Sequence, residues 1–487
     1  MRYALANWAP DQGEIGAGGL RDARNVVPVA RHYEPFYDAV ESGEAIDLRA
    51  RGLAGYRDQA TSVHIYAGDA AKLYERNSDG SWTDRSGPGG YTATDSTRWR
   101  SAQFGDRAIF VNGQEPPQYI EMSSGSAFAD LPGSPGVAQH IAQYSEFLFL
   151  GNTGSSGAEL KWCSIGDSDV WTANVNQANA QVFPDGGEIR GLIGGNESLI
   201  IFQEKTIRRA LYVGPPLIHQ IQPIEEERGC AASGSIARVG RRIFFLAEDG
   251  FYQLTDAGAQ SIGTQFVDAW FQADAQRDFY YRMSAVIDPY RKLYLCAYAS
   301  VNSSSGQPDS IIIFNWAVNR WSYARLDCDL LFPILTQSVT LEDLDAIYGS
   351  IDDIPLSLDD PLFAGGVITL GMMSPGRKLA TFSGAPLEAV FTTDDILLAD
   401  NQIMEIQEVA PIGDCASAYV SVAGRMNPQT TACCQWTGRS TAPWCWWWTT
   451  WKPLPLRRSV RCWNSTRTSP SAPTSASCRC WTATTSP

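Results

Sequence analysis

The sequence repeats one structural pattern without repeating its letters: an apolar segment, a short polar turn, and a second segment rich in aromatic or β-branched residues. It occurs at Lys72–Asp84 (KLYERNSDGSWTD), Arg241–Thr255 (RRIFFLAEDGFYQLT) and Ser310–Leu326 (SIIIFNWAVNRWSYARL). The turns carry Asp-Gly or Asn, which tolerate the left-handed backbone of a tight hairpin. Each unit predicts a β-hairpin, and many such hairpins in one chain predict an all-β fold, a β-propeller or a large β-sandwich.

Strand signals divide the chain into regions. Between residues 56 and 330 they follow one another closely and predict a β-propeller of five to seven blades. Alternating apolar residues in 331–425 predict a small β-sandwich or barrel domain. Residues 1–55 show few regular strands and are expected to form an N-terminal arm that lies across a neighbouring subunit or across the propeller. The candidate assembly contacts on this arm, apolar residues that a free arm would leave exposed, are Leu20, Val26, Val27, Tyr33 and Phe36.

The end of the chain has a different composition. Residues 431–487 hold eight of the sixteen tryptophans and six of the eleven cysteines, with no acidic residue. Neither helical nor strand periodicity is present there, which indicates a reading-frame shift near Met426 and a non-native tail over residues 426–487. A cysteine-rich metal or disulfide module is the alternative, but these cysteines form no CxxC pair and have no histidine among them.

Charge is distributed unevenly along the chain. Residues 1–414 hold 30 Lys and Arg against all 53 Asp and Glu, a net −23. Such an acidic surplus argues against tight binding of nucleic acid, which needs clustered Lys and Arg. There is no apolar run of about 18 residues, as a membrane-spanning helix would need, and the N-terminus lacks the apolar core of a secretory signal. The five cysteines before residue 426 are scattered singly, which is typical of reduced, buried thiols.

The residues suggest no catalytic, cofactor or metal site. The four histidines, His32, His64, His140 and His219, are not spaced as metal ligands and stand near no nucleophile motif. Glycosidases use two carboxylates on opposite sides of a sugar bond. The paired carboxylates in this chain are adjacent in sequence and lie in polar loops, so solvated turns are the simpler interpretation. We therefore predict a protein that is not an enzyme.

Several segments together resemble tail proteins of short-tailed double-stranded DNA bacteriophages. Specifically, they resemble the nozzle or hub proteins that close the head-to-tail channel, also called packaged-DNA stabilisation proteins. The resemblance extends diffusely over residues 1–425. The segments that carry it are Gly18–Phe36, Ile165–Trp171 (IGDSDVW), Asp185–Ile193 (DGGEIRGLI), Leu199–Ile207 (LIIFQEKTI) and Leu379–Ile396 (LATFSGAPLEAVFTTDDI).

This resemblance implies a structural protein of the virion tail, made in the bacterial cytoplasm. Several copies, expected as a hexamer, would form a ring that retains the packaged DNA and conducts it during ejection. Its partners would be further copies of itself, the portal or adaptor, other tail proteins, and viral duplex DNA passing without specific binding. No membrane and no cofactor are expected.

A channel that releases DNA quickly should not hold it by counterion release, so an acidic lumen is expected. The candidate channel-facing carboxylates are Asp352, Asp353, Asp359, Asp360, Asp394 and Asp395. Ordinary solvated turns are the alternative interpretation of these residues.

The alternative function is a propeller that binds or cleaves carbohydrate, as a tail adhesin or glycan depolymerase. Asn77–Trp82 (NSDGSW) resembles the Asp-box turn of sialidase propellers. A sugar-processing propeller should gather acidic and aromatic residues at one central mouth. A ring subunit should instead show apolar flanks and an acidic lumen.

Overall fold

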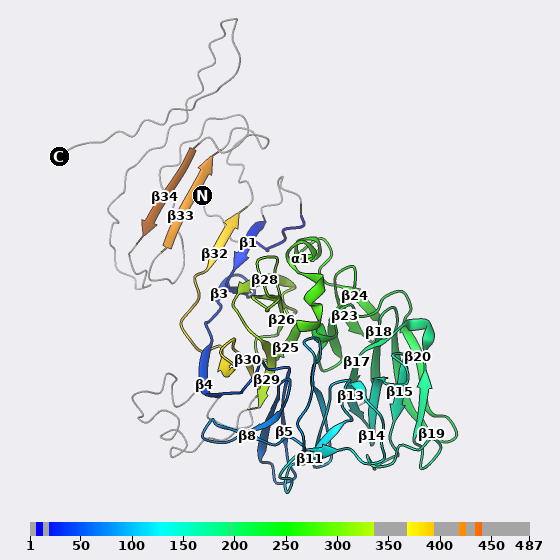
Figure 1. Ribbon diagram of the computed structural model, residues 1–487. Coiled ribbons are helices and arrows are strands. Elements are labelled where there is room, and N and C mark those ends of the chain that lie inside the picture. Colours follow the sequence, from blue (N-terminus) through cyan, green and yellow to red (C-terminus); the bar gives the residue numbers. More distant parts are fainter. Residues whose placement is uncertain are drawn as a thin grey trace, which may run out of the picture. The chain divides into compact units, whose positions relative to one another are not determined.

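The three hairpins predicted from the sequence are all present in the computed structural model, which describes residues 6–12, 19–195, 197–335, 368–393, 418–424 and 434–440. In each turn the Gly or Asn expected from the sequence has a positive φ angle: +82° at Gly80, +149° at Gly250 and +52° at Asn319. The chain divides into two compact units, residues 1–13 with 19–393, and residues 14–18 with 394–487. Figure 1 shows the described strands in sequence colours.

Among its described residues the first unit contains seven larger sheets, six with four strands and one with six. In six of these seven sheets, four strands that are consecutive in the sequence pair in order as an antiparallel blade. Blade 1 is β5–β8 (Gly52–Arg57, Val63–Gly68, Leu73–Arg76, Trp82–Asp84) and blade 2 is β9–β12 (Arg100–Phe104, Arg107–Val111, Gln118–Glu121, Ala129–Asp130). Blade 3 is β13–β16 (Ala138–Tyr144, Phe147–Thr153, Glu159–Trp162, Asn179–Val182) and blade 4 is β17–β20 (Ile189–Gly194, Leu199–Gln203, Ile207–Gly214, Ile218–Glu225). Blade 5 is β21–β24 (Ala237–Val239, Arg242–Leu246, Phe251–Thr255, Gly258–Ser261) and blade 6 is β25–β28 (Ser284–Asp288, Leu293–Tyr298, Ser310–Asn315, Arg320–Arg325).

The seventh sheet closes the ring. It joins β29 (Leu330–Leu335), β30 (Ile368–Met373) and β31 (Lys378–Thr381) to β4 (Val40–Ala45) from the other end of the chain, with Thr381 opposite Val40. The first strands of successive blades contact each other from blade 1 to blade 4 and from blade 5 to blade 7, and β29 of blade 7 also contacts β5 of blade 1. Blades 4 and 5 contact through their last strands, β20 and β24. Seven blades around one axis, closed by strands from both ends of the chain, form a β-propeller, as the sequence predicted.

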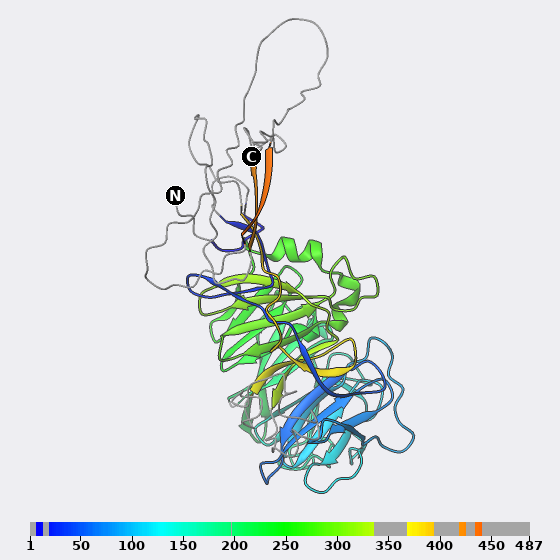
Figure 2. The ribbon, with the colours of Figure 1, turned by 90° about the vertical axis from the view of Figure 1, so that its left-hand side faces the viewer.

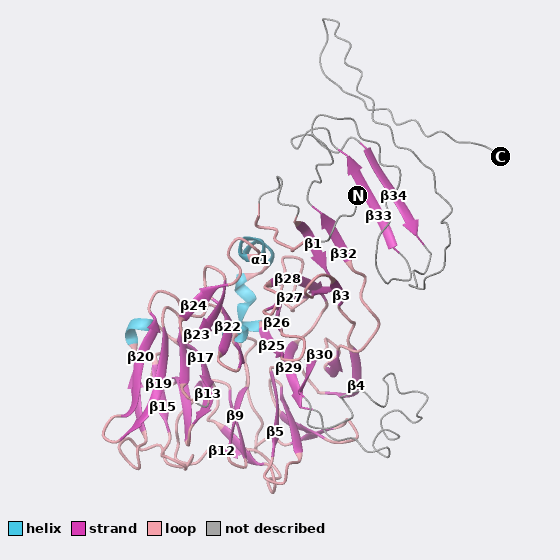
Figure 3. Cartoon of the chain, turned by 180° about the vertical axis from the view of Figure 1, so that it is seen from behind, coloured by secondary structure: helices cyan, strands magenta, loops and turns pink. Residues whose placement is uncertain are grey.

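Figure 3 shows how little helix the propeller contains. Its described residues form one α-helix, α1 (Asp268–Asp274), in the connection between blades 5 and 6, where the Asp11 carboxylate accepts hydrogen bonds from the N–H groups of Ala269 and Trp270. The short 3-10 helix η3 (Arg277–Arg282) follows α1 in this connection. The other two 3-10 helices are η1 (Pro184–Gly186) and η2 (Ser233–Ser235).

The N-terminal segment is part of the propeller. Strand β1 (Leu20–Arg24) extends the outer edge of blade 6 and pairs with both β28 and β32 (Val390–Thr393). Strands β2 (Val26–Pro28) and β3 (Tyr33–Pro35) pair with each other. The chain then runs into β4, which Figure 2 shows in blue near the yellow strands of blade 7.

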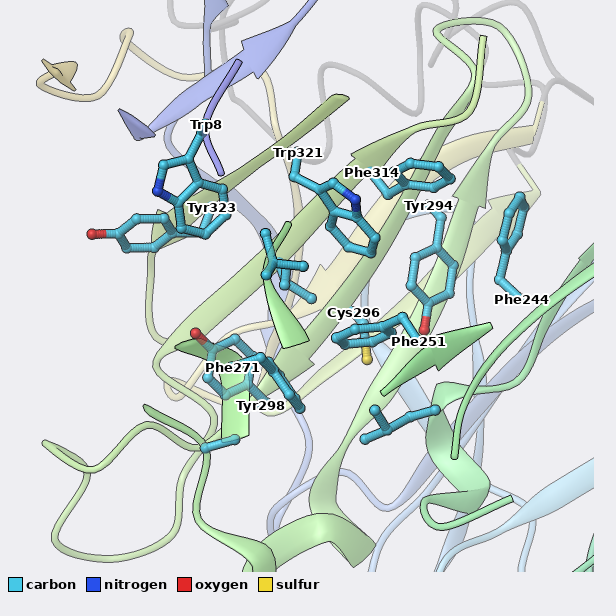
Figure 4. Close-up of a cluster of buried hydrophobic side chains, with 14 of the residues drawn as sticks. Trp8, Phe244, Phe251, Phe271, Tyr294, Cys296, Tyr298, Phe314, Trp321 and Tyr323 are labelled. Atoms are coloured by element: carbon cyan, nitrogen blue, oxygen red, sulfur yellow. The ribbon is translucent and has the colours of Figure 1, made fainter. Parts of the chain in front are cut away.

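The largest aromatic core lies where this segment meets blades 5 and 6 (Figure 4). Trp8 is fully buried, with its ring centroid 4.8 Å from Trp270 and 5.1 Å from Tyr323. On blade 6, Trp321 stacks near Phe314 with ring centroids 4.5 Å apart. Aromatic side chains of this size bury about 150–250 Å² each, so the N-terminal segment completes the core.

Both domain boundaries predicted from the sequence differ from the structure. Strand β4 and the start of β5 fall within the predicted arm of residues 1–55, and β29–β31 span the start of the predicted domain at 331–425, yet all of them are propeller strands. The sequence indicated strand character around β31 but not the strand β4, and it could not show that the two pair. That pairing joins segments more than 300 residues apart.

In the second unit the structure describes one hairpin, β33 (Ala418–Gly424) with β34 (Cys434–Ser440). Strand β34 lies inside the stretch where no strand periodicity was found. Pairing between backbones does not require alternating side chains, so a periodicity argument misses such a strand. The rest of residues 426–487, and with it the predicted frame shift, lies outside the described residues.

Candidate functional site

The six carboxylates expected to face a DNA channel, Asp352, Asp353, Asp359, Asp360, Asp394 and Asp395, lie outside the described residues. Their place in an acidic lumen therefore stays a prediction.

The five apolar residues of the predicted arm contact the chain's own propeller. Leu20, Val26, Val27 and Phe36 are buried in the cores of blades 5 to 7. Tyr33 is half-buried, 5.2 Å from the Phe391 ring and beneath the Arg320 guanidinium. Of the two alternatives left by the sequence, packing on a neighbour or on the propeller itself, the structure shows the second. These side chains therefore leave little surface for contact with another subunit.

The four histidines lie apart from one another. His32 is exposed beside Glu34, and His219 is buried among the rings of Phe147, Phe149 and Trp162. Within the described part of the chain, no group of three His, Cys, Asp or Glu side chains is placed to hold a metal ion. The same part contains no helix long and apolar enough to cross a membrane.

The turn at Asn77–Trp82 in blade 1, which resembles an Asp-box, is held by hydrogen bonds between its own residues. One Asp79 carboxylate oxygen accepts hydrogen bonds from the Ser81 N–H, at 2.9 Å, and from the Ser81 hydroxyl, at 2.6 Å. Nearby on the same blade, His64 Nδ1 lies 2.7 Å from Glu75 Oε1, and Arg85 Nε donates to Glu75 Oε2 at 2.8 Å. The hydrogen bond with Glu75 raises the pKa of His64. The carboxylates of Asp79 and Glu75 therefore stabilise the hairpins of blade 1.

Arginines gather at one end of the central channel. Because each blade begins with its innermost strand, all seven innermost strands run in the same direction, and their first residues meet at one mouth. Arg51 directly precedes β5, Arg98 stands two residues before β9, and Arg282 stands two residues before β25. Arg98 donates from Nε to the Tyr281 carbonyl oxygen at 3.0 Å. The segment η3 is thereby tied to blade 2.

Three acids, Asp69, Asp95 and Asp329, lie near these arginines and Arg49. Asp95 contacts Arg49 at 2.8 Å and Arg282 at 2.5 Å. Burial alone would raise the pKa of Asp95, but hydrogen bonds from Arg282 and Tyr281 and the charge of Arg49 lower it to about 2. The buried Asp329 also lies within the field of the arginines, yet burial raises its pKa to about 6. Among the described residues, buried N–H groups on Arg49 (Nη1), Arg51 (Nε and Nη1), Arg98 (Nη1) and Arg282 (Nε) have no hydrogen-bond partner. The described mouth is therefore basic.

Within the channel lies a cavity of about 150 Å³. Its walls come from the innermost strands of blades 2, 3 and 4 and from the segment that leads into blade 5. The polar residues that line it are Arg100, Ser101, His140 and Ser233, and its apolar wall includes Ile236.

The charge of Arg100 acts on His140 in this cavity. Burial lowers the pKa of Arg100 to about 10, so its guanidinium remains charged at neutral pH. Burial and the nearby charges of Arg100 and Arg190 hold the pKa of His140 well below its usual range, so the imidazole is neutral. Tyr56 donates a hydrogen bond to Ser101 Oγ at 2.7 Å, which leaves the Ser101 hydroxyl hydrogen available as a donor. The cavity therefore combines one cation with neutral donors.

Sequence reasoning missed this cluster. It treated His140 as an ordinary structural residue and assigned no role to Arg98 or Arg100. Arg98 and Arg100 are two residues apart, so in an extended chain both side chains point to the same side. This spacing was the signal in the sequence for a cluster of cations. The signal becomes informative only once β9 is known to be an innermost strand.

Comparison with known proteins found similarity only among solved structures. No protein-family model matches the chain, and no curated protein matches it. Among solved structures, the chain is similar to a streptogramin B lyase, with 10% identity over 71% of this chain and 97% of the lyase and a TM-score of 0.40. It is also similar to BamB from Moraxella catarrhalis, with 10% identity over 76% of this chain and 94% of BamB and a TM-score of 0.37. A third likeness is to the N-terminal domain of Nup159, with 9% identity over 75% of this chain and 98% of that domain and a TM-score of 0.41. Values this low give no information on activity, ligand or partner.

Proposed function

We propose that this chain is a structural subunit of the tail of a short-tailed double-stranded DNA bacteriophage. Several copies, expected to number six, assemble into a ring in the nozzle or hub that closes the head-to-tail channel. The ring retains packaged DNA and conducts it during ejection. The resemblance of residues 1–425 to such tail proteins supports this role.

The observation that carries the proposal is the chemistry of the propeller's mouth. A sugar-cleaving propeller was expected to gather acidic and aromatic residues there. The described mouth instead gathers Arg49, Arg51, Arg98 and Arg282, and its Asp95 is engaged by arginines. An acid that must donate a proton to a sugar needs a raised pKa, whereas that of Asp95 is lowered to about 2. This arrangement disfavours the depolymerase alternative.

The dimensions of the channel support a DNA path formed between subunits. A cavity of about 150 Å³ is smaller than the roughly 300–1,000 Å³ clefts that hold drug-sized ligands. Duplex DNA cannot pass through such a space, so the conduit of the proposed ring lies between copies of the chain.

Apolar surface on the outer edges of blades 3 and 4 supports assembly. The β19–β20 hairpin ends in Val213 and Leu217, which are 49% and 61% exposed. Tyr212 at the same tip donates a hydrogen bond to the Gln177 side chain at 3.1 Å, which ties the tip to the blade 3 loop that carries the exposed Val175. Apolar side chains that cluster on a surface mark interaction sites. We assign the flank formed by Val175, Tyr212, Val213 and Leu217 to contact between subunits.

Light scattering and negative-stain electron microscopy of the purified full-length chain test this role. We expect rings of defined copy number and dissociation on Leu217→Asp. The matched control is Val301→Asp, at a residue of blade 6 that is 59% exposed and lies away from the flank; it should leave the ring intact. A monomer at the highest soluble concentration, or equal effects of both variants, would contradict the proposal. So would release of oligosaccharide from a host glycan.

A second measurement tests the conduit. Duplex DNA should show no detectable binding to the rings at low salt, because an acidic lumen does not hold phosphates by counterion release. Tight binding that weakens steeply with salt would refute a sliding channel. Labelling of virions with antibody against this chain should mark the tail.

A further inference from the structure

We propose that the central cavity of the propeller is a binding site for a small tetrahedral oxyanion, phosphate or sulfate, held by Arg100. This inference goes beyond the proposed structural role and does not depend on it. It rests on a charged side chain, a cavity and a set of hydrogen-bond donors that occur together.

The first observation is an uncompensated charge. Among the described residues no carboxylate pairs with the Arg100 guanidinium, and the ionisable neighbour that acts on it is the buried Cys230. Burial raises the pKa of this thiol to about 12, so it is neutral and supplies no counter-charge. Arg100 is half-buried beside the cavity, and taking a cation partly out of water without a partner is costly. A counter-ion from solution would supply the missing partner.

The second observation is space at this position. The cavity of about 150 Å³ opens beside Arg100. A cavity of that volume holds a molecule of the size of benzene, so a tetrahedral oxyanion fits in it together with water. Gly191 maintains the wall, because a Cβ atom there would come within 2.3 Å of Ile236 Cδ1, which also lines the cavity.

The third observation is the set of donors. A planar guanidinium can bind an oxyanion through two parallel N–H bonds. The hydroxyls of Ser101 and Ser233 line the same space, and the Ser101 hydrogen is free because its oxygen already accepts from Tyr56. His140 also lines the space as a neutral imidazole, and its one N–H is engaged by the backbone of Ile189, so the donors to the anion come from Arg100 and the two serines. None of these groups carries a negative charge that would repel an anion.

The basic mouth favours entry of an anion from that end. Arg98 lies two residues before Arg100, and Arg51 and Arg282 stand at the same end of the channel. Clefts lined by charge of one sign raise the local concentration of the opposite ion. The surplus of acids elsewhere on the chain does not cancel this local field, which salt screens within about 10 Å.

Isothermal titration calorimetry with the full-length chain tests the site, with inorganic phosphate, sulfate and acetate as separate probes at matched ionic strength. We expect phosphate and sulfate to bind with a dissociation constant between about 1 μM and 1 mM, and acetate at least tenfold more weakly. No binding of phosphate or sulfate above the response to chloride overturns the proposal, as does acetate binding as tightly as either.

Variants locate the site. Arg100→Met removes the charge and should weaken phosphate binding at least tenfold. Arg241→Gln is the control, because Arg241 is exposed, is paired with Glu197 and does not line the cavity; it should leave binding within about threefold of the unmodified chain. If Arg100→Met does not fold, Arg100→Lys keeps the charge but lacks the two-pronged geometry, and it should also weaken binding. Unchanged binding in whichever Arg100 variant folds would place the anion elsewhere and overturn the assignment.

Discussion

Replacing Trp8 by alanine is expected to lower the free energy of unfolding by about 3–5 kcal/mol, the usual cost of removing a buried tryptophan. The Trp8 side chain is fully buried against Trp270 and Tyr323, and its Nε1 donates to the Arg21 carbonyl oxygen at 3.0 Å. An aromatic side chain that buries about 150–250 Å² contributes about 4–6 kcal/mol at 25 cal/mol per Å², an upper limit that overlaps this range.

Urea unfolding followed by circular dichroism measures this loss, as a shift in midpoint at unchanged slope. Trp8→Phe keeps a ring but loses the hydrogen bond and should cost less than Trp8→Ala. The control is Tyr290→Ala, because Tyr290 is 71% exposed and its loss should change stability by no more than about 0.5 kcal/mol.

A loss below about 1 kcal/mol for Trp8→Ala would refute the packing argument. Residues 6–12 would then behave in solution as an arm that adds nothing to the propeller core. Deletion of residues 1–36 makes the same distinction. It removes Leu20, Val26, Val27 and Phe36 from the core and should lower Tm strongly, whereas loss of a separate arm would leave Tm unchanged.

Two further effects follow from local geometry. Gly43→Ala should be more destabilising than Gly105→Ala in thermal unfolding: both glycines have positive φ, but a Cβ at Gly43 would lie 2.3 Å from the Gly80 carbonyl oxygen, and one at Gly105 meets nothing within 4 Å. Equal losses would show that the contact between β4 and blade 1 is loose. The raised pKa of His64 means that its bond with Glu75 stabilises the chain fully below about pH 6.5, and this contribution is lost as pH rises through the pKa of the folded state. The urea midpoint of the unmodified chain should therefore decrease between pH 6 and 8.5, and this decrease should be smaller in His64→Gln. An unchanged pH profile in the variant would mean that other groups cause the decrease.

The sequence by itself determined the local elements of this protein. Left-handed residues such as Gly80 and Asn319, flanked by aromatic and β-branched strands, specify hairpins that form from neighbouring residues alone. Many such hairpins in succession were enough to predict an all-β propeller, and the seven observed blades fall within the five to seven expected.

Only the tertiary structure decided which distant segments meet. The pairing of β4 with β31, the docking of Trp8 beside Tyr323, and the position of Arg100 in the channel depend on closure of the ring. Strand propensity and alternation say that a segment will pair and which face it buries, but they carry no information about a partner more than 300 residues away. Closure also places the start of every innermost strand at one mouth, and for that reason scattered arginines became a cluster that the linear sequence did not reveal.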